Sequence, residues 1–173
     1  MKKLLFLLIS VLVMFSFAAC GNVPQKESYQ PGASTIDNAT NNDKNFGIND
    51  TAVFDDIKIT ATEIKESKGE DYFTPEEGKI FVGIKFVIEN VSDEEQSVSS
   101  LLMFTAYEDD IKSDYSINAA CAFDDGTLDG SIMPGKMLVG WYALEASENW
   151  SVIEITAQPD LFSNSNAVFK FEK

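Results

Sequence analysis

The sequence contains no histidine, and all 13 of its basic residues are lysines, so arginine is absent as well. Without histidine, neither a Ser-His-Asp nor a Cys-His nucleophile can be assembled, and no imidazole can bind a metal. The 28 acidic residues leave a formal net charge of −15. Nucleic-acid binding depends on basic side chains that displace counterions, so the charge argues against nucleic acid as a partner. No pair of carboxylates is marked out as acid and nucleophile, so we expect no enzyme.

Cysteine is also scarce, because the chain has only two, Cys20 and Cys121. Cys20 follows two lysines and the run from Leu4 to Phe17, in which 12 of 14 residues are apolar. This run is shorter than the roughly 20 residues that a membrane-spanning helix needs. Small residues follow it, which completes the pattern of a secretory signal. Residues 1–19 are therefore predicted to be removed as a signal peptide.

The segment Phe17-Ala18-Ala19-Cys20-Gly21 resembles the lipobox of bacterial lipoproteins. The resemblance implies a diacylglycerol on the Cys20 thiol, which anchors the mature chain to the outer face of the cell membrane. Two acyl chains suit a lasting anchor, since a single one binds a bilayer only marginally. With Cys20 lipidated, Cys121 has no disulfide partner, and we interpret it as a small buried residue.

Residues 20–48 are poor in large apolar side chains and rich in Asn, Ser, Thr, Pro, Gly and Gln. Such a segment cannot bury enough surface to offset the entropy lost on ordering, so a disordered tether is predicted. A flexible chain of this length would hold the domain roughly 25–30 Å from its anchor. The remaining residues, 49–173, have the usual size of one domain with its own core.

Within 49–173, short stretches of alternating apolar and polar residues indicate β-strands, and no long amphipathic helix competes with them. The clearest strand is 79–90, in which Ile80, Val82, Ile84, Phe86 and Ile88 share one face. The other predicted strands are short and separated by turns, and they lie near 53–61, 97–107, 111–117, 131–144, 150–157 and 167–171. Such a pattern predicts an all-β antiparallel sandwich.

Several motifs after residue 54 are similar to a family of Gram-positive extracellular domains called domain of unknown function 4352. The motifs are Gly78-Lys79, the alternation from Val82 to Asn90, Ser92-Asp93-Glu94-Glu95, Phe104, Tyr107, and Leu128-x-Gly130-x-Ile132-x-Pro134-Gly135-Lys136 with Gly140 and Tyr142. The resemblance implies an immunoglobulin-like sandwich, like that of the mycobacterial immunoprotective extracellular protein. It brings no catalytic residues.

An acidic turn is the one candidate metal site in the sequence. Asp124, Asp125 and Asp129 lie around Gly126, and calcium prefers such oxygen ligands. The spacing is not that of an EF-hand loop, however, and a solvated turn is the alternative interpretation. No other cofactor is expected. The aromatic residues Trp141, Tyr142 and Trp150 could line a binding face, but core positions suit them better.

Together these features predict a lipid-anchored surface protein whose sandwich binds another component of the cell envelope, without catalysis. Rigid sandwiches present loops at both ends, which suits recognition. Two alternatives stay open. The first is a lipoprotein that binds calcium or a small solute through its acidic loops. The second is a structural accessory that its tether holds near a membrane complex.

Overall fold

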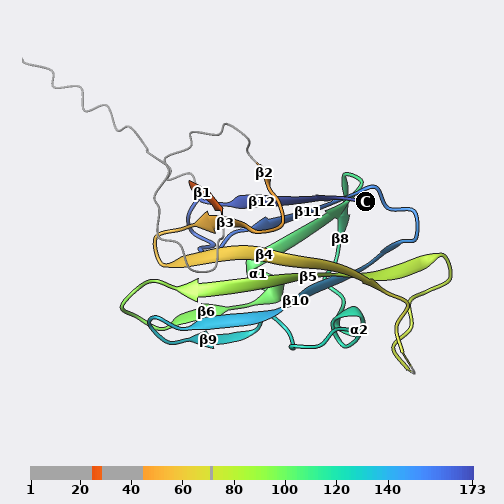
Figure 1. Cartoon of the computed structure of the whole chain (residues 1–173), viewed down its shortest axis with the longest axis horizontal. Coiled ribbons are helices and arrows are strands. Elements are labelled where there is room, and N and C mark those ends of the chain that lie inside the picture. Colours follow the sequence, from red (N-terminus) through yellow and green to blue (C-terminus); the bar gives the residue numbers. More distant parts are fainter. Residues whose placement is uncertain (1–24, 29–44, 71) are drawn as a thin grey trace, which may run out of the picture.

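The computed structural model of the chain describes residues 25–28, 45–70 and 72–173. Strands dominate this part of the chain (Figure 1). Their bounds are β1 (Gln25–Ser28), β2 (Asn45–Phe46), β3 (Asp50–Val53), β4 (Ile57–Ser67), β5 (Lys79–Asn90), β6 (Gln96–Val98), β7 (Phe104–Glu108), β8 (Ile111–Ser113), β9 (Gly130–Ile132), β10 (Met137–Ser147), β11 (Val152–Ala157) and β12 (Ala167–Glu172). The helices of these ranges are α1 (Ser100–Met103) and α2 (Ile117–Ala120), one turn each.

Two five-stranded sheets form the two layers of the molecule. The first sheet has the order β1-β3-β4-β5-β10, and the second has the order β2-β12-β11-β7-β8. A separate two-stranded ribbon pairs β6 with β9. The pairing of β2 with β12 is parallel, whereas the longer pairings, such as β4 with β5 and β5 with β10, are antiparallel. The predicted fold class, an all-β antiparallel sandwich, is confirmed.

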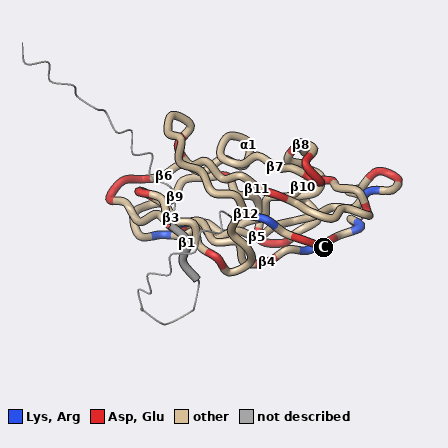
Figure 2. Tube along the Cα trace, turned by 90° about the horizontal axis from the view of Figure 1, so that it is seen from above, with Lys and Arg blue, Asp and Glu red and all other residues tan. Residues whose placement is uncertain are grey.

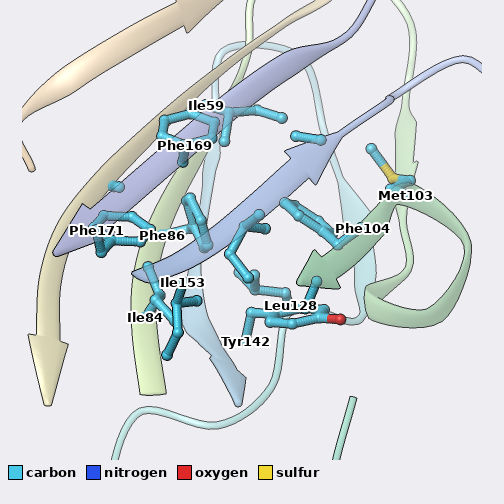
Figure 3. Packing of buried hydrophobic residues seen from close by; sticks show 14 of the residues in the cluster. Ile59, Ile84, Phe86, Met103, Phe104, Leu128, Tyr142, Ile153, Phe169 and Phe171 are labelled. Atoms are coloured by element: carbon cyan, nitrogen blue, oxygen red, sulfur yellow. The ribbon is translucent and has the colours of Figure 1, made fainter. Parts of the chain in front are cut away.

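The main core lies between the two sheets (Figure 3). The inward face of β5, from Ile80 to Ile88, is buried throughout, as its alternation predicted. Phe86 from this face contacts rings of the second sheet, with centroids 5.2 Å from Phe169 and 5.5 Å from Phe104. Burial of this aromatic and β-branched surface stabilises the sandwich in place of any disulfide. Trp150 and Tyr142 are buried in the same core, as expected of large aromatics.

The outer face of the first sheet carries a second, smaller core. Phe81, on the outer face of β5, is buried against α2 and against Ala143 of β10. Trp141 of β10 is buried nearby, and its ring stacks on that of Phe123 with centroids 5.0 Å apart. The segment from 114 to 128 therefore covers part of a face that would otherwise contact water.

Two strand glycines allow this covering segment to approach the sheet. A Cβ at Gly83 would lie 2.8 Å from the Phe123 ring, and one at Gly140 would lie 2.5 Å from the carbonyl oxygen of Thr127. Both distances are shorter than any side chain tolerates. Glycine inside a strand often marks such a close approach of another chain segment.

The prediction of one continuous strand over 97–107 is wrong, because α1 separates β6 from β7. The Asp129 carboxylate accepts hydrogen bonds from the backbone N–H and the hydroxyl of Ser100, both at 2.9 Å. These bonds hold the start of α1 and depend on a residue 29 positions away. The strand predicted over 111–117 is likewise shorter, since β8 ends at Ser113.

The strand predicted over 131–144 is divided into β9 and β10 by the turn at Pro134-Gly135. Gly135 has a φ of +68°, and the Lys136 N–H donates to the Met133 carbonyl at 3.0 Å. This is the type II turn expected of a Pro-Gly pair, in which glycine takes the left-handed position. The turn places the two strands in different sheets, since β9 pairs with β6 and β10 pairs with β5.

Two short strands lie inside the range predicted to be tether. β1 pairs antiparallel with β3, with Gln25 opposite Val53, and β2 pairs with β12 from Asn45 on. The sandwich thus begins before residue 49 and takes a strand from residues 25–28. The predicted signal peptide, Cys20, and residues 21–24 and 29–44 of the predicted tether lie outside the described residues.

Candidate functional site

An open cleft of about 430 Å³ lies at one end of the sandwich, between β8 and the end of β10. Residues 111–116 form one wall, and Lys79, Glu108 and Glu145 complete the lining. A second hollow of about 200 Å³ shares residues 112–115 and reaches Leu101 and Tyr142. The short segment after β8 therefore separates two hollows.

The turn that leads into β8 consists of Asp109 and Asp110. Both have a left-handed backbone, with φ of 45° and 69°, which suits a tight hairpin turn. The Asp109 carboxylate accepts hydrogen bonds from the backbone N–H groups of Ser151 and Val152, at 2.8–3.2 Å. These bonds hold the hairpin against the β10–β11 turn, and they fix the position of the cleft wall.

The charged side chains at the cleft have local roles too. Glu108 accepts from the backbone N–H of Ser147 at 2.8 Å, and Glu145 accepts from the backbone N–H of Glu76 at 2.6 Å. Lys79 and Lys112 also line the cleft, with Asp114 as a third carboxylate. Figure 2 shows acidic residues gathered on the turns at the ends of the sandwich. The cleft is thus polar and mixed in charge, with a small acidic excess.

Two tyrosines lie behind the cleft wall, with ring centroids 5.3 Å apart. Burial raises the pKa of the Tyr115 phenol, and the nearby Asp129 carboxylate raises it further. Burial also raises the pKa of Tyr142, and Asp114 adds to the shift. A tyrosine with a raised pKa remains protonated at neutral pH, so neither phenol is activated as a nucleophile or a base.

The structure does not bring the predicted calcium ligands together as a site. Asp125 accepts a hydrogen bond from the Lys85 ammonium, whose pKa this bond raises, and Asp129 holds the start of α1. Asp124 lies exposed on the turn. Among residues 25–28, 45–70 and 72–173, no three His, Cys, Asp or Glu side chains are grouped to hold a metal. The calcium hypothesis therefore has no ligand cluster to support it there.

Trp141 lies next to the same acidic turn. The ammonium groups of Lys65 and Lys85 lie 5.4 and 5.6 Å from its ring centroid. The indole N–H is buried and finds no hydrogen-bond acceptor in the described part of the chain. Because Phe123 covers the ring, Trp141 does not line an open binding face.

The prediction that Cys121 is buried is wrong. Cys121 is exposed at the end of α2, where it forms the C-cap. The preceding residues, Ala119 and Ala120, turn toward the sheet and are buried. The apolar run thus forms a helical turn with one face on the sheet and one face in solvent. The helical period places the Cys121 thiol on the solvent face.

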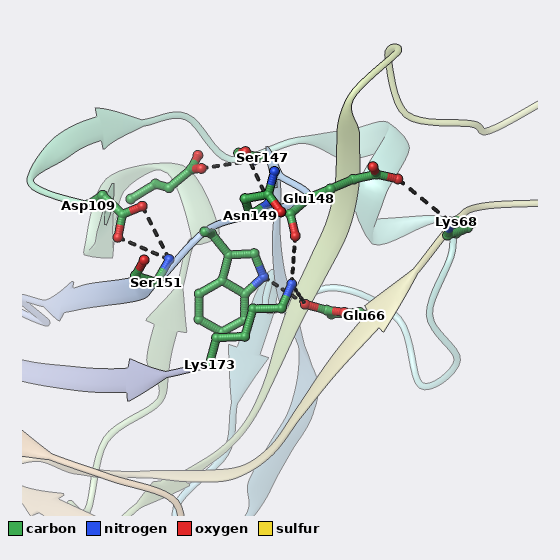
Figure 4. A network of polar contacts seen from close by, with 10 residues as sticks. Glu66, Lys68, Asp109, Ser147, Glu148, Asn149, Ser151 and Lys173 are labelled. Atoms are coloured by element: carbon green, nitrogen blue, oxygen red, sulfur yellow. Dashed lines mark hydrogen bonds and ion pairs between the residues drawn. The ribbon is translucent and has the colours of Figure 1, made fainter.

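A polar network surrounds Trp150 at the same end of the sandwich as the cleft (Figure 4). Its indole N–H donates to Glu66 at 2.7 Å, and the Lys173 ammonium pairs with the same carboxylate at 2.7 Å. The ammonium also lies 5.1 Å from the centroid of the Trp150 ring. Hydrogen bonding to Lys173 lowers the pKa of Glu66. The last residue of the chain is therefore attached to β4 and to the β10–β11 turn.

The sequence analysis did not find the cleft. Its lining comes from β5, β7, β8 and β10, and no spacing along the chain reports that these strands meet. One signal existed, since Ile111 is an apolar residue directly after an acidic turn. Its side chain is 73% exposed in the structure.

The two sheets and the cleft define a β-sandwich domain. The chain belongs to the family described as domain of unknown function DUF4352, whose model matches residues 46–168. The prediction of this family is confirmed. No curated protein matches the sequence significantly. Within the described residues, we find no helix long and apolar enough to cross a bilayer.

Solved structures similar to this chain share its fold. YcdA of Bacillus subtilis, whose name marks it as a candidate lipoprotein, is 13% identical with a TM-score of 0.59, and the match covers 70% of this chain and 38% of YcdA. A conserved hypothetical protein of Bacillus anthracis is 12% identical with a TM-score of 0.53, covering 71% and 94%. A β-sandwich protein of Clostridium difficile is 20% identical with a TM-score of 0.50, covering 79% and 100%. At these identities the likeness shows the sandwich fold alone.

Proposed function

We propose that the chain is a surface lipoprotein in which a lipid on Cys20 holds the sandwich at the cell membrane. In this proposal residues 1–19 are a signal peptide, and the anchor faces the outside of the cell. The support comes from the apolar run that ends in Ala18-Ala19-Cys20 and from the lipoprotein name of the similar YcdA structure. The predicted likeness to the mycobacterial immunoprotective extracellular protein stays a prediction.

We further propose that the sandwich binds another envelope or membrane protein through the cleft between β8 and β10, without catalysis or cofactor. One observation carries this step, namely the exposed Ile111 on β8 beside an open cleft. β8 is the last strand of its sheet, so its outer backbone groups are open to an added strand. A partner segment could pair with β8, place an apolar side chain near Ile111, and offer cationic groups to Glu108, Asp114 and Glu145.

The anchor is tested by mass spectrometry of the protein from native membranes. The chain without substitutions should begin at Cys20 and carry the mass of a diacylglycerol. Cys20→Ser should lose that mass and leave the membrane fraction, whereas Cys121→Ser should behave like the unchanged chain. If the chain without substitutions retains residues 1–19, or carries no lipid, the anchor is refuted.

The cleft is tested with a photo-crosslinking amino acid at single positions in living cells. Ile111 is the test position, and Met137, which is 64% exposed at the other end of β10, is the matched control. We expect one discrete crosslinked protein from Ile111 and none from Met137. Adding Lys112→Glu, which removes a cation from the cleft wall, should change the yield without unfolding the domain.

Equal crosslinking from both positions would show nonspecific contact and would contradict binding at the cleft. Absence of any crosslinked protein from Ile111 would favour the alternative that the domain binds a small solute. The two experiments are independent, because a lipidated chain can lack a protein partner at this cleft.

A further inference from the structure

The pairing of β1 shows from which end the chain enters the sandwich. β1 runs antiparallel to β3, with Gln25 opposite Val53 and Ser28 opposite Asp50. Gln25 therefore lies at the end where β3 turns into β4. Figure 1 shows β1 and β3 at this end, opposite the C-terminus. The chain therefore enters the sandwich at Gln25 on this side.

Three turns form this end of the molecule, at 54–57, 91–95 and 133–136, and we call it the turn end. The buried Asn90 joins them. Its backbone N–H donates to Lys136 O at 2.9 Å, and its side-chain amide donates to the carbonyls of Ile132 and Glu94, each at 2.7 Å. The N–H of Val91 donates to the Asp56 carbonyl at 2.9 Å. The turn end is thus one hydrogen-bonded unit, and it moves with the sandwich.

The cleft lies at the opposite end, which we call the cleft end. Lys79, the first residue of β5, lines the cleft, whereas Asn90, the last residue of β5, belongs to the turn end. A strand of this length spans about 36 Å at roughly 3.3 Å per residue. The loop between β4 and β5 also belongs to the cleft end, and its Tyr72 is 97% exposed.

Four residues separate Cys20 from Gln25. Five Cα–Cα steps reach at most about 18 Å, even in a fully extended chain. If residues 20–44 were all an unpaired tether, the average distance would be about 28 Å and no side of the domain would be preferred. Pairing of β1 therefore shortens the connection and attaches it at one end only.

We propose that β1 fixes the orientation of the sandwich on the membrane, so that the turn end faces the bilayer and the cleft end faces away from it. This inference rests on the proposed lipid anchor at Cys20. The cleft and Tyr72 are then presented to a partner at up to about 54 Å from the membrane, the sum of the two lengths above.

The turn end faces the bilayer without inserting into it. It carries acidic residues at 55, 56, 93, 94 and 95, which anionic lipid repels. Its exposed large apolar side chains are Val91, Met133 and Met137. The orientation is thus a consequence of where the chain enters the domain, and it should be seen on neutral lipid, which does not repel these acidic residues.

Energy transfer between the domain and the membrane tests the orientation. The full lipidated chain, with Cys121→Ala to remove the exposed thiol, is reconstituted in phosphatidylcholine vesicles that contain a headgroup-linked acceptor dye. The donor dye is attached at Met133→Cys on the turn end or at Tyr72→Cys on the cleft end. We expect at least a severalfold higher transfer efficiency from position 133 than from position 72.

Two variants of β1 complete the test. Lys26→Pro with Glu27→Pro removes backbone donors from β1 and prevents its pairing, so the difference between the two positions should fall toward zero. Lys26→Ala with Glu27→Ala keeps the backbone and should retain the difference. The orientation alone would be refuted if protein with the original β1 sequence floats with the vesicles but shows equal energy transfer from positions 72 and 133. Protein that fails to float would refute the anchor and the orientation together.

Discussion

At the scale of single residues, two glycines determine whether the covering segment can lie on the sheet. A Cβ at Gly140 would meet the Thr127 carbonyl oxygen at 2.5 Å, and backbone cannot move aside as a side chain can. A Cβ at Gly83 would meet the Phe123 ring at 2.8 Å, and this ring can shift. Close packing explains why glycine occupies both positions in strands that otherwise favour larger residues.

Gly83→Ala should therefore lower the free energy of unfolding by about 1–3 kcal/mol, and Gly140→Ala should lower it by more, because overpacking costs most where no group can yield. Gly47→Ala is the matched control, since a Cβ there meets only the Asp50 carboxylate at 3.6 Å. Urea unfolding followed by tryptophan fluorescence measures all three. An unchanged midpoint for Gly140→Ala would contradict the close approach of residues 114–128.

Glu66 gives a pH-dependent prediction at the same scale. Lys173 lowers its pKa, so the ionised carboxylate stabilises the folded state above the ordinary pKa of glutamate. This contribution is lost as the pH falls through the lowered pKa. Glu66→Gln should thus be less stable than the unchanged chain at pH 7, by about 1 kcal/mol or less for so exposed a pair. The two should converge in acid.

The matched control is Glu63→Gln on the same strand. Glu63 pairs with Lys65, and the Lys65 side chain is the more exposed of the two. Thermal unfolding at a series of pH values should show little effect of this change. If Glu63→Gln and Glu66→Gln had the same pH profile, the network around Trp150 would have no special part in stability.

At the scale of elements, Asn90 determines how three turns meet. Its buried amide donates to two carbonyls, and its oxygen accepts from Ser92 N at 2.9 Å and from the Ser92 hydroxyl at 2.8 Å. Asn90→Ala would leave the Ile132 carbonyl buried without this donor, which should cost about 1–3 kcal/mol. Ser92→Ala, which removes a half-buried hydroxyl, should cost less. Chemical denaturation measures both, and equal losses would contradict the central role of Asn90.

The strands that could be predicted from sequence are those whose own side chains determine their burial. β5 was predicted with its observed bounds because five alternating apolar residues are buried on one face. Asn90 is the last residue of both the predicted and the observed strand. Such features depend on neighbours along the chain, and periodicity reports them.

The elements that were missed depend on distant partners. α1 interrupts a predicted strand where Asp129 binds Ser100 from 29 residues away. β1 contains no apolar residue, so only its backbone pairing with β3 makes it a strand. Cys121 was expected inside because its neighbours are apolar, but one helical turn places it outside. The cleft is built from four strands at once, and for that reason no local pattern predicted it.

At the scale of the whole molecule, the excess of acidic residues, which gives the full sequence a formal net charge of −15, governs how the domain responds to salt. Repulsion among like charges opposes the compact state, and salt screens it. The melting temperature should therefore rise when sodium chloride is increased from low to physiological concentration. Calcium chloride at matched ionic strength should raise it equally, because the described residues hold no group of three metal ligands.

This comparison also tests the calcium alternative. Asp125 pairs with Lys85 and Asp129 holds Ser100, so calcium would have to break both contacts before it could bind at the turn. An added stabilisation that saturates with calcium, and that Asp124→Asn removes, would show that this happens. The measurement is differential scanning calorimetry with calcium, magnesium and sodium. If the melting temperature follows ionic strength alone, the acidic turn stabilises the fold and does not bind calcium. The proposed recognition at the cleft between β8 and β10 would then have no calcium-dependent alternative.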